Sequence, residues 1–327
     1  MYTSIDQSIE ILDRSRHSDY KAELAKDVCR GLERFPKELF PKYFYDERGS
    51  KLFEQITELP EYYQTRTERA LLESIAPELA GEYSFTEMIE FGSGSSAKTR
   101  LLLDNMTSVG LLERYVPIDV SRDFLVATAE QLDVHYPIHV TPVVGDFLDG
   151  LEHIERSGPA LVIFLGGTIG NLYRNDAASF LSKIAEGMGE EDALLMGVDL
   201  VKDPYLLHLA YNDSQGITAK FNKNVLHVLN RELGGCFDPD SFCHYAFYNP
   251  DDTRIEMRLV SGINQSIPIN HLDIEVMFEE GESILTEISR KFTKASAERL
   301  LKDAGLRMTK WWSDSEKLFG LLLARKR

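Results

Sequence analysis

The residues with the clearest chemistry lie in a glycine turn, Gly92-Ser-Gly-Ser-Ser-Ala-Lys98, directly after an apolar segment that carries Glu90. Glycines at 92 and 94 let the backbone turn tightly and approach a ligand, and a helix that follows presents free N–H groups at its start. Asp119 ends the next apolar segment, 27 residues after Gly92. A carboxylate at that point can accept hydrogen bonds from both hydroxyls of a ribose. The pattern predicts either an adenosine site or an ordinary strand-to-helix turn.

The turn lacks the third glycine of the dinucleotide fingerprint, because Ser96 and Ala97 occupy the corresponding positions. A pyrophosphate binder normally keeps a compact glycine-rich turn. A ligand without phosphates, such as S-adenosylmethionine, tolerates a looser loop. The pattern therefore disfavours a nicotinamide dehydrogenase.

Two further loops follow apolar segments and carry polar residues. Asp146 can accept from the exocyclic amine of an adenine and Phe147 can pack on its ring, although a helix cap with a buried Phe explains the same pair. The segment Phe164-Leu-Gly-Gly-Thr-Ile-Gly-Asn171 can form a backbone-lined floor under a reacting group, or a simple turn. An Asn side chain at its end can donate to a carboxylate and accept from an amine.

The elements that must position these residues alternate between strand-like and helix-like patterns. Such alternation predicts a parallel sheet with helices on both faces. The predicted strands are Thr86–Phe91, Tyr115–Asp119, His139–Val144, Ala160–Leu165 and Ala193–Asp199, and the predicted helices are Lys98–Asn105, Ser121–His135 and Asp176–Gly187, with Ser121 and Asp176 as N-caps.

The pattern changes after Asp199. Residues 205–232 look helical and 244–288 contain short alternating segments typical of antiparallel strands. A helix at 294–304 and two strands at 307–312 and 320–324 complete the chain, the strands as an antiparallel pair on the parallel sheet. We expect a split sheet domain formed by 67–199 and 290–327, and a second domain formed by 1–66 and 200–289.

Composition limits the classes of partner. The net charge of −17 and pI near 5.0 oppose binding to nucleic acid or an anionic membrane, so we expect a small-molecule ligand. Three cysteines without a CxxC motif predict neither a disulfide framework nor a zinc site. His135 and His139 have an HxxxH spacing, but Pro137 breaks the helix between them, so we expect no metal. Without a signal-like start or a membrane-length apolar run, we expect a cytoplasmic monomer.

Six blocks, in this order, resemble the family of histidine-specific, S-adenosylmethionine-dependent methyltransferases. The resemblance runs from about residue 20 to the C-terminus and implies an α/β fold: a Rossmann-like class I methyltransferase sheet with a second α+β domain that binds the substrate. The blocks are YFYDERGSKLFEQITELPEYYQTRTE (43–68), GSGSSAKTR (92–100), FLGGTIGN (164–171), DLVKD (199–203), FNKNVL (221–226) and LTEISRKF (285–292).

The resemblance also implies roles for single residues. Gly167 is a small departure, because some members have Ser there. The residues implied to bind the cofactor are Gly92, Lys98, Asp119, Asp146 and Phe147. Those implied to bind the amino and carboxylate groups of a substrate histidine are Tyr62, Asn171 and Tyr211. Those implied to bind its imidazole are Glu287, Ile288 and Ser289, with Met257 against the ring.

The implied activity is threefold methylation of the α-amine of L-histidine to hercynine, which leads toward ergothioneine. Methyl transfer from a sulfonium needs proximity and alignment rather than a metal or a covalent nucleophile. We therefore predict no catalytic side chain as such, only positioning by Tyr62 and Asn171. A fungal branch of the family methylates a prenylated tryptophan; Glu287 and Met257 favour histidine. Another amino acid as substrate, or a non-catalytic module that binds S-adenosylmethionine, remain the alternatives.

Overall fold

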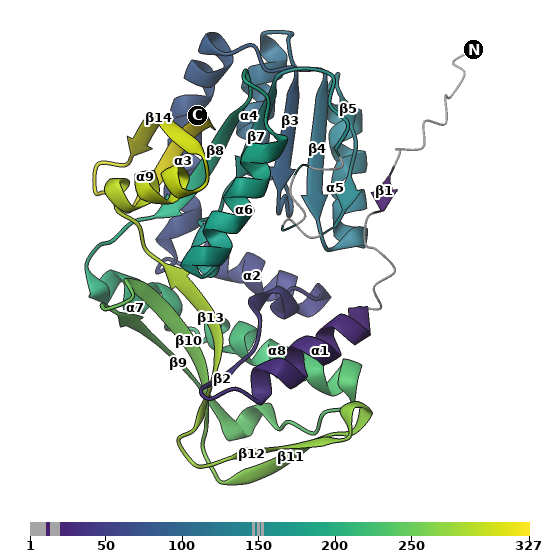
Figure 1. Ribbon diagram of the computed structural model, residues 1–327, viewed down its shortest axis with the longest axis vertical. Coiled ribbons are helices and arrows are strands. Elements are labelled where there is room, and N and C mark those ends of the chain that lie inside the picture. The colour runs from purple at the N-terminus through teal and green to yellow at the C-terminus, as the bar shows by residue number, and fades with distance from the viewer. Residues whose placement is uncertain (1–10, 14–19, 146–147, 149–150, 152–153) are drawn as a thin grey trace.

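The computed structural model describes residues 11–13, 20–145, 148, 151 and 154–327, which build two main sheets (Figure 1). The large sheet has the strand order β1-β6-β4-β3-β7-β8-β15-β14, with β5 paired to β4. Its strands are β1 (Leu12–Asp13), β3 (Glu87–Phe91), β4 (Arg114–Asp119), β5 (His139–Val140), β6 (Val143–Val144), β7 (Ala160–Phe164), β8 (Ala193–Asp199), β14 (Leu306–Ser313) and β15 (Phe319–Lys326).

The direction of the strands confirms the predicted sheet. β3, β4, β7 and β8 run parallel, and β15 pairs antiparallel with both β8 and β14. The chain order reverses between β3 and β7, so the crevice at the carboxyl ends of these two strands is where open α/β sheets bind ligands. The glycine turn that follows β3 and the Gly166–Gly167 loop that follows β7 both lie there.

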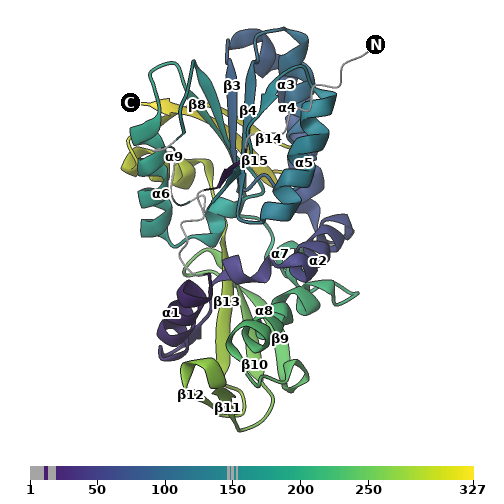
Figure 2. The same cartoon turned by 90° about the vertical axis from the view of Figure 1, so that its right-hand side faces the viewer.

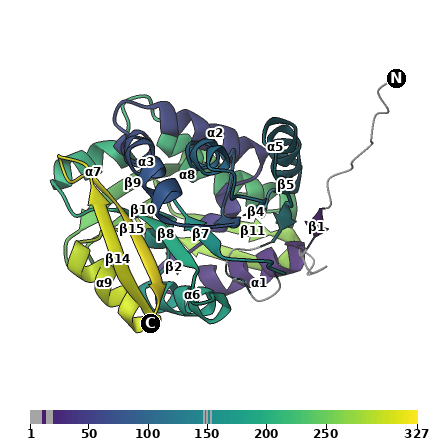
Figure 3. The same ribbon diagram turned by 90° about the horizontal axis from the view of Figure 1, so that it is seen from above.

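Helices cover both faces of this sheet (Figure 3). Adjacent residues of β3 face opposite sides of the sheet: Met88 packs in the core on the α3 side, and Ile89 packs in the core on the α6 side. One core contains residues of α3 (Tyr63–Glu82), α4 (Arg100–Ser108) and α5 (Arg122–His135), and the opposite core contains residues of α6 (Arg174–Gly187) and α9 (Lys294–Asp303).

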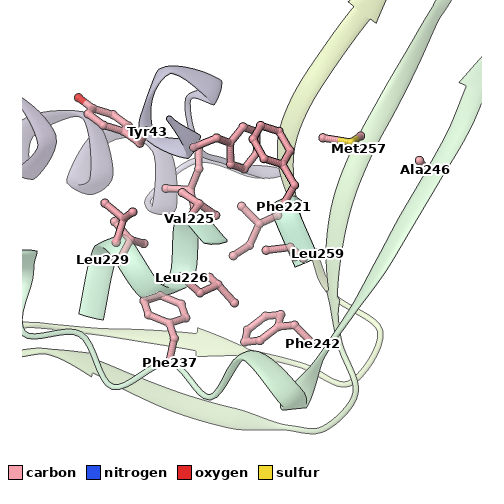
Figure 4. Packing of buried hydrophobic residues seen from close by; sticks show 14 of the residues in the cluster. Tyr43, Phe221, Val225, Leu226, Leu229, Phe237, Phe242, Ala246, Met257 and Leu259 are labelled. Carbon is pink, nitrogen blue, oxygen red and sulfur yellow. The ribbon is translucent and has the colours of Figure 1, made fainter. Parts of the chain in front are cut away.

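The second sheet lies below the first in Figures 1 and 2. It has the order β2-β13-β10-β9, and a separate hairpin, β11 with β12, extends from it. The aromatic and aliphatic side chains between helix α8 and strands β9 and β10 form its core (Figure 4). The elements are β2 (Lys37–Glu38), β9 (Phe242–Asn249), β10 (Arg254–Ser261), β11 (Gln265–Ile269), β12 (Ile274–Phe278), β13 (Ser283–Arg290), α1 (Tyr20–Leu32), α2 (Glu47–Glu58), α7 (Pro204–Tyr211) and α8 (Ile217–Leu233).

Most predicted elements agree with the structure to within a few residues at their ends, and three predictions fail in a more specific way. The strand expected at 139–144 is divided into β5 and β6, and Pro142, which has no N–H to donate, lies in the break. Helix α6 begins at Arg174 with Tyr173 as its N-cap, so the prediction that Asp176 is the cap was wrong; Asp176 lies in the first turn. The helical region expected at 205–232 is divided at 212–216 into α7 and α8.

The strands of the large sheet at 87–199 and 306–326 are separate in sequence from those of the four-stranded sheet, which supports the proposed domains. Strand β1 is an exception, because it pairs with β6 at the edge of the large sheet although it belongs to the N-terminal segment. The division 67–199 with 290–327, and 1–66 with 200–289, therefore remains our proposal. No helix within the described ranges has the length and apolar character needed to cross a membrane.

Candidate active site

A cavity of about 740 Å³ opens at the carboxyl ends of β3, β4 and β7, within the size range of small-molecule sites. Gly92, Lys98 and Asp119 line it together, so the structure brings these three predicted cofactor residues to one place. Asp146 and Phe147 lie outside the described residues, although the preceding Gly145 lines the same cavity.

The glycine turn has the geometry that its residues predict. Gly92 (φ 67°) and Gly94 (φ 50°) adopt left-handed conformations that disfavour larger residues. Asp119 braces this turn, because its Oδ2 accepts from the Gly94 N–H at 3.0 Å and its Oδ1 accepts from the Ser121 N–H at 3.0 Å. Burial raises the pKa of Asp119, and these backbone hydrogen bonds oppose the rise. Its oxygens retain lone pairs for a ligand.

Replacing Asp119 by Ala is expected to weaken binding of S-adenosylhomocysteine by roughly 1–3 kcal/mol, the value of hydrogen bonds to a charged group. Isothermal titration measures the change, with Asp123→Ala on the exposed start of α5 as the control. Because Asp119 also braces the turn, thermal unfolding of the ligand-free variant separates a loss of contact from a loss of fold. Unchanged affinity would remove Asp119 from the cofactor site.

Glu90 stabilises the surroundings of the glycine turn through two side-chain hydrogen bonds. Its buried carboxylate accepts from the Thr99 hydroxyl at 2.6 Å and from the Tyr115 hydroxyl. Burial raises the pKa of Glu90 to about 7, against the opposing effect of the two hydroxyls. Glu90 therefore ties the start of α4 and strand β4 to the end of β3, an internal role that its position after an apolar segment did not reveal.

A second carboxylate joins the two glycine loops. Glu68, on α3, is fully buried; its Oε1 accepts from the Gly166 N–H at 2.7 Å, and its Oε2 pairs with the ammonium of Lys98. Lys98 is therefore held at the loop after β3 by a residue that also holds the loop after β7. Sequence reasoning did not identify Glu68, although it lies at the end of the first block of the resemblance.

An inner chamber lies between the cavity and the second sheet. Tyr62, Asn171 and Glu287 line both spaces, so the chamber and the cavity adjoin each other. Ile288 lines the outer cavity and not the chamber, because adjacent residues of β13 point to opposite faces. The predicted substrate residues that line the chamber are Tyr62, Asn171, Tyr211, Met257, Glu287 and Ser289.

Several polar side chains converge on this chamber without a protein partner. Within the described ranges, the side chains of Tyr62, Asn171 and Glu287 make no hydrogen bond. Burial raises the pKa of the Glu287 carboxyl to about 7, and the positive charge of Lys291 opposes the rise. Glu287 is buried, whereas Tyr62 and Asn171 are half-buried. Buried polar groups are normally paired, so an unpaired buried carboxylate that faces the same space as two further unpaired polar side chains indicates a ligand site.

Met257 closes the chamber beside Glu287. It lies on β10 directly opposite Glu287 on β13, and residues paired in this way point to the same face of a sheet. Its side chain is 2% exposed and lies at the upper end of the apolar cluster that contains Phe221 (Figure 4). The size of Met257 therefore limits the ring that can reach Glu287.

Part of the chamber wall belongs to a buried ionic cluster that the sequence analysis did not identify. Lys291 donates to Asp199 Oδ2 at 2.7 Å, to the Tyr211 hydroxyl at 3.0 Å and to Ser289 Oγ at 2.8 Å. Asp199 also pairs with Lys202 and accepts from the Tyr63 hydroxyl. Asp199 and Lys202 belong to a block of the resemblance, but nothing in their local pattern indicated this role.

The cluster determines which hydrogen bonds the chamber wall can offer. The three N–H donors of Lys291 are all used, and two of them go to the hydroxyl oxygens of Tyr211 and Ser289. The Tyr211 hydroxyl donates its proton to Ser289 Oγ at 2.7 Å. The proton of Ser289 is then free for a ligand, so the wall presents a donor at Ser289 close to an acceptor at Glu287.

Comparison with known proteins identifies the family of this chain. A family model described as histidine-specific methyltransferase, SAM-dependent, matches residues 24–326. The chain is 47% identical to a histidine N-alpha-methyltransferase of Mycolicibacterium smegmatis over 94% of its length and 96% of that protein, and 46% identical to one of Mycobacterium tuberculosis over 93% and 95%. It is 32% identical to the ergothioneine biosynthesis protein 1 of Neurospora crassa, over 89% of this chain and 34% of the fungal protein. The chain thus belongs to the family of histidine-specific methyltransferases that use S-adenosylmethionine as cofactor.

Proposed function

We propose that this enzyme transfers three methyl groups in succession from S-adenosylmethionine to the α-amine of L-histidine and so forms hercynine, the first step toward ergothioneine. The observation that carries the proposal is the presence of an acceptor, Glu287, and a donor, Ser289, in a chamber that adjoins the cofactor cavity. A neutral imidazole has one N–H and one bare nitrogen, which match these two groups. The names of the bacterial relatives support histidine, and that of the Neurospora crassa protein supports the pathway.

We assign the outer cavity to S-adenosylmethionine, which carries the transferred methyl group on a cationic sulfur. We assign Asp119 to the ribose hydroxyls and, by resemblance, Asp146 and Phe147 to the adenine. Lys98 keeps N–H donors beyond its pair with Glu68, and these can bind a carboxylate. Open space in front of Gly92 and Gly94, where an added Cβ would meet nothing within 4 Å, fits the close approach of a ligand to the backbone.

We assign the inner chamber to the amino-acid substrate, whose α-carboxylate is negatively charged. The carboxylate of Asp199 lies in the chamber wall, and it pairs with two buried ammonium groups, Lys202 and Lys291, so this cluster has an excess of positive charge. In a buried environment this charge favours a carboxylate of the substrate nearby. We assign the carboxylate and amine to Tyr62, Asn171 and Tyr211, whose positioning aligns the amine for an in-line displacement.

The attacking amine must be neutral, and no described lining residue is an evident strong base placed for this purpose. We propose that the proton of the α-ammonium passes to water in the outer cavity, which adjoins the chamber. The protein then contributes alignment of the two reactants, which is worth up to roughly 7–11 kcal/mol in favourable reactions.

Mass spectrometry of a panel of amino acids, incubated with enzyme and a methyl-labelled donor, tests the proposal. We expect histidine to gain three labelled methyl groups and tryptophan to gain none. Preferential labelling of another amino acid would replace histidine as the substrate. If no amino acid is labelled, titration with histidine in the presence of S-adenosylhomocysteine distinguishes a non-catalytic binding module from a different class of substrate.

A further inference from the structure

The amide of Gln64 lies where the two cavities meet and has no partner. Gln64 is the second residue of α3, is 4% exposed and lines both the chamber and the outer cavity. Neither its Oε1 nor its Nε2 makes a hydrogen bond with any part of the chain that the structure describes. Neither the resemblance nor the sequence pattern assigns it a role.

A buried amide without partners destabilises a protein, because its polar atoms lose their hydrogen bonds to water and gain none in the folded state. Glu68 lies one turn further along the same face of the helix, and its polar atoms have partners: it accepts a hydrogen bond from the Gly166 N–H and forms an ion pair with the ammonium of Lys98. Gln64, on the same face, lines the junction of the chamber and the outer cavity together with Tyr62 and Gly166, and its amide makes no hydrogen bond within the described residues. Its missing partner is therefore a ligand atom at the junction.

Resting on the proposed function, we propose that the Gln64 side-chain oxygen accepts a hydrogen bond from an N–H of the substrate α-amine and orients the nitrogen for the first two methyl transfers. The α-amine must reach this junction, because the substrate histidine is assigned to the chamber and S-adenosylmethionine, which donates the methyl group, is assigned to the outer cavity. In each transfer the nitrogen lone pair forms the N–C bond, the S–C bond breaks toward sulfur, and S-adenosylhomocysteine leaves. The ammonium product then loses a proton to water before the next transfer.

The number of N–H bonds makes this contact depend on the stage of the reaction. The lone pair of the attacking nitrogen faces the methyl group, so only its N–H bonds are available to the protein. A neutral amine has two N–H bonds in histidine, one in Nα-methylhistidine and none in Nα,Nα-dimethylhistidine. A Gln64 acceptor therefore assists the first and second transfers and has nothing to accept from in the third.

The test uses Gln64→Met, which keeps the length of the side chain and removes both polar atoms. We expect kcat/KM to fall about tenfold for histidine and for Nα-methylhistidine, the effect of one lost hydrogen bond, and less than twofold for Nα,Nα-dimethylhistidine. Gln55→Met, at an exposed position of α2, is the matched control and should leave all three values unchanged. An equal loss for all three substrates, or no loss for any, overturns the proposal.

Thermal unfolding of the ligand-free proteins provides a second readout. Because Gln64→Met removes an unpaired buried amide, its melting temperature should equal or exceed that of the wild type, whereas a structural role for Gln64 predicts a lower one. If Gln64→Met does not fold, the smaller Gln64→Leu replaces it in the same three assays. Wild-type enzyme that methylates none of the three histidine forms refutes the proposed function itself, a result distinct from a uniform loss in the variant.

Discussion

The double variant Glu287→Ala, Met257→Val is expected to lose histidine turnover and to accept larger apolar rings such as indole. Glu287 is a buried acceptor without a protein partner, and an imidazole N–H supplies the hydrogen bond that it lacks. An indole has one N–H, and this group lies at a different distance from Glu287 than an imidazole N–H does. The side chain of Met257, opposite Glu287 on the neighbouring strand, also obstructs the larger indole ring. We expect the ratio of kcat/KM for histidine over tryptophan to fall at least about a hundredfold, as when a site loses its polar discrimination.

The measurement is methylation of histidine and tryptophan side by side in wild type, both single variants and the double variant. Glu275→Ala, at an exposed position of β12, serves as a control that removes a carboxylate without touching the chamber. Equal ratios of the two rates in wild type and the double variant would show that these residues do not select the ring.

The pH dependence of the wild type gives a further check on Glu287. Its pKa in the ligand-free protein is about 7, raised from 4.5 mainly by burial. Only the ionised carboxylate is a pure acceptor, so binding of a neutral imidazole should improve as pH rises through about 7. Because the folded pKa exceeds the unfolded one, the neutral acid stabilises the fold at low pH, and this contribution is lost as pH rises from about 4.5 to about 7.

Replacing Asp199 by Asn is expected to produce the largest loss of stability, about 3–5 kcal/mol. Asp199 is the carboxylate that pairs with both Lys202 and Lys291, and all three side chains are almost fully buried. Asn keeps the volume but removes the negative charge, so two buried ammonium groups lose their counterion. Since Lys291 also orders Tyr211 and Ser289, histidine binding should weaken together with the fold.

Urea unfolding of wild type and Asp199→Asn measures this loss directly. The matched control is Asp303→Asn, which breaks the exposed pair with Arg174 and should cost less than about 1 kcal/mol. An unfolding free energy for Asp199→Asn within about 1 kcal/mol of the wild-type value would mean that the cluster does not depend on this charge.

The sequence alone determined the parts of the enzyme that depend on neighbouring residues. Alternating strand-like and helix-like patterns predicted a parallel sheet with helices on both faces, and the two last strands were predicted as an antiparallel pair on that sheet. The glycine turn and Asp119 were identified as one unit because strand, turn and helix are contiguous. Local patterns did not locate the break at Pro142 between β5 and β6, the start of α6 or the division between α7 and α8.

The tertiary structure decided which distant groups meet. Tyr62, Asn171 and Glu287 could be assigned to one chamber only by resemblance, since no pattern within a segment relates residues so far apart. The bond from Lys291 to Asp199 joins residues 92 positions apart, and the donor at Ser289 follows from it. The lack of a partner for Gln64 is likewise a property of its packed surroundings. Hydrophobic periodicity specifies which face of an element is buried, whereas the hydrogen-bond partners of a buried polar group depend on how the elements pack against one another.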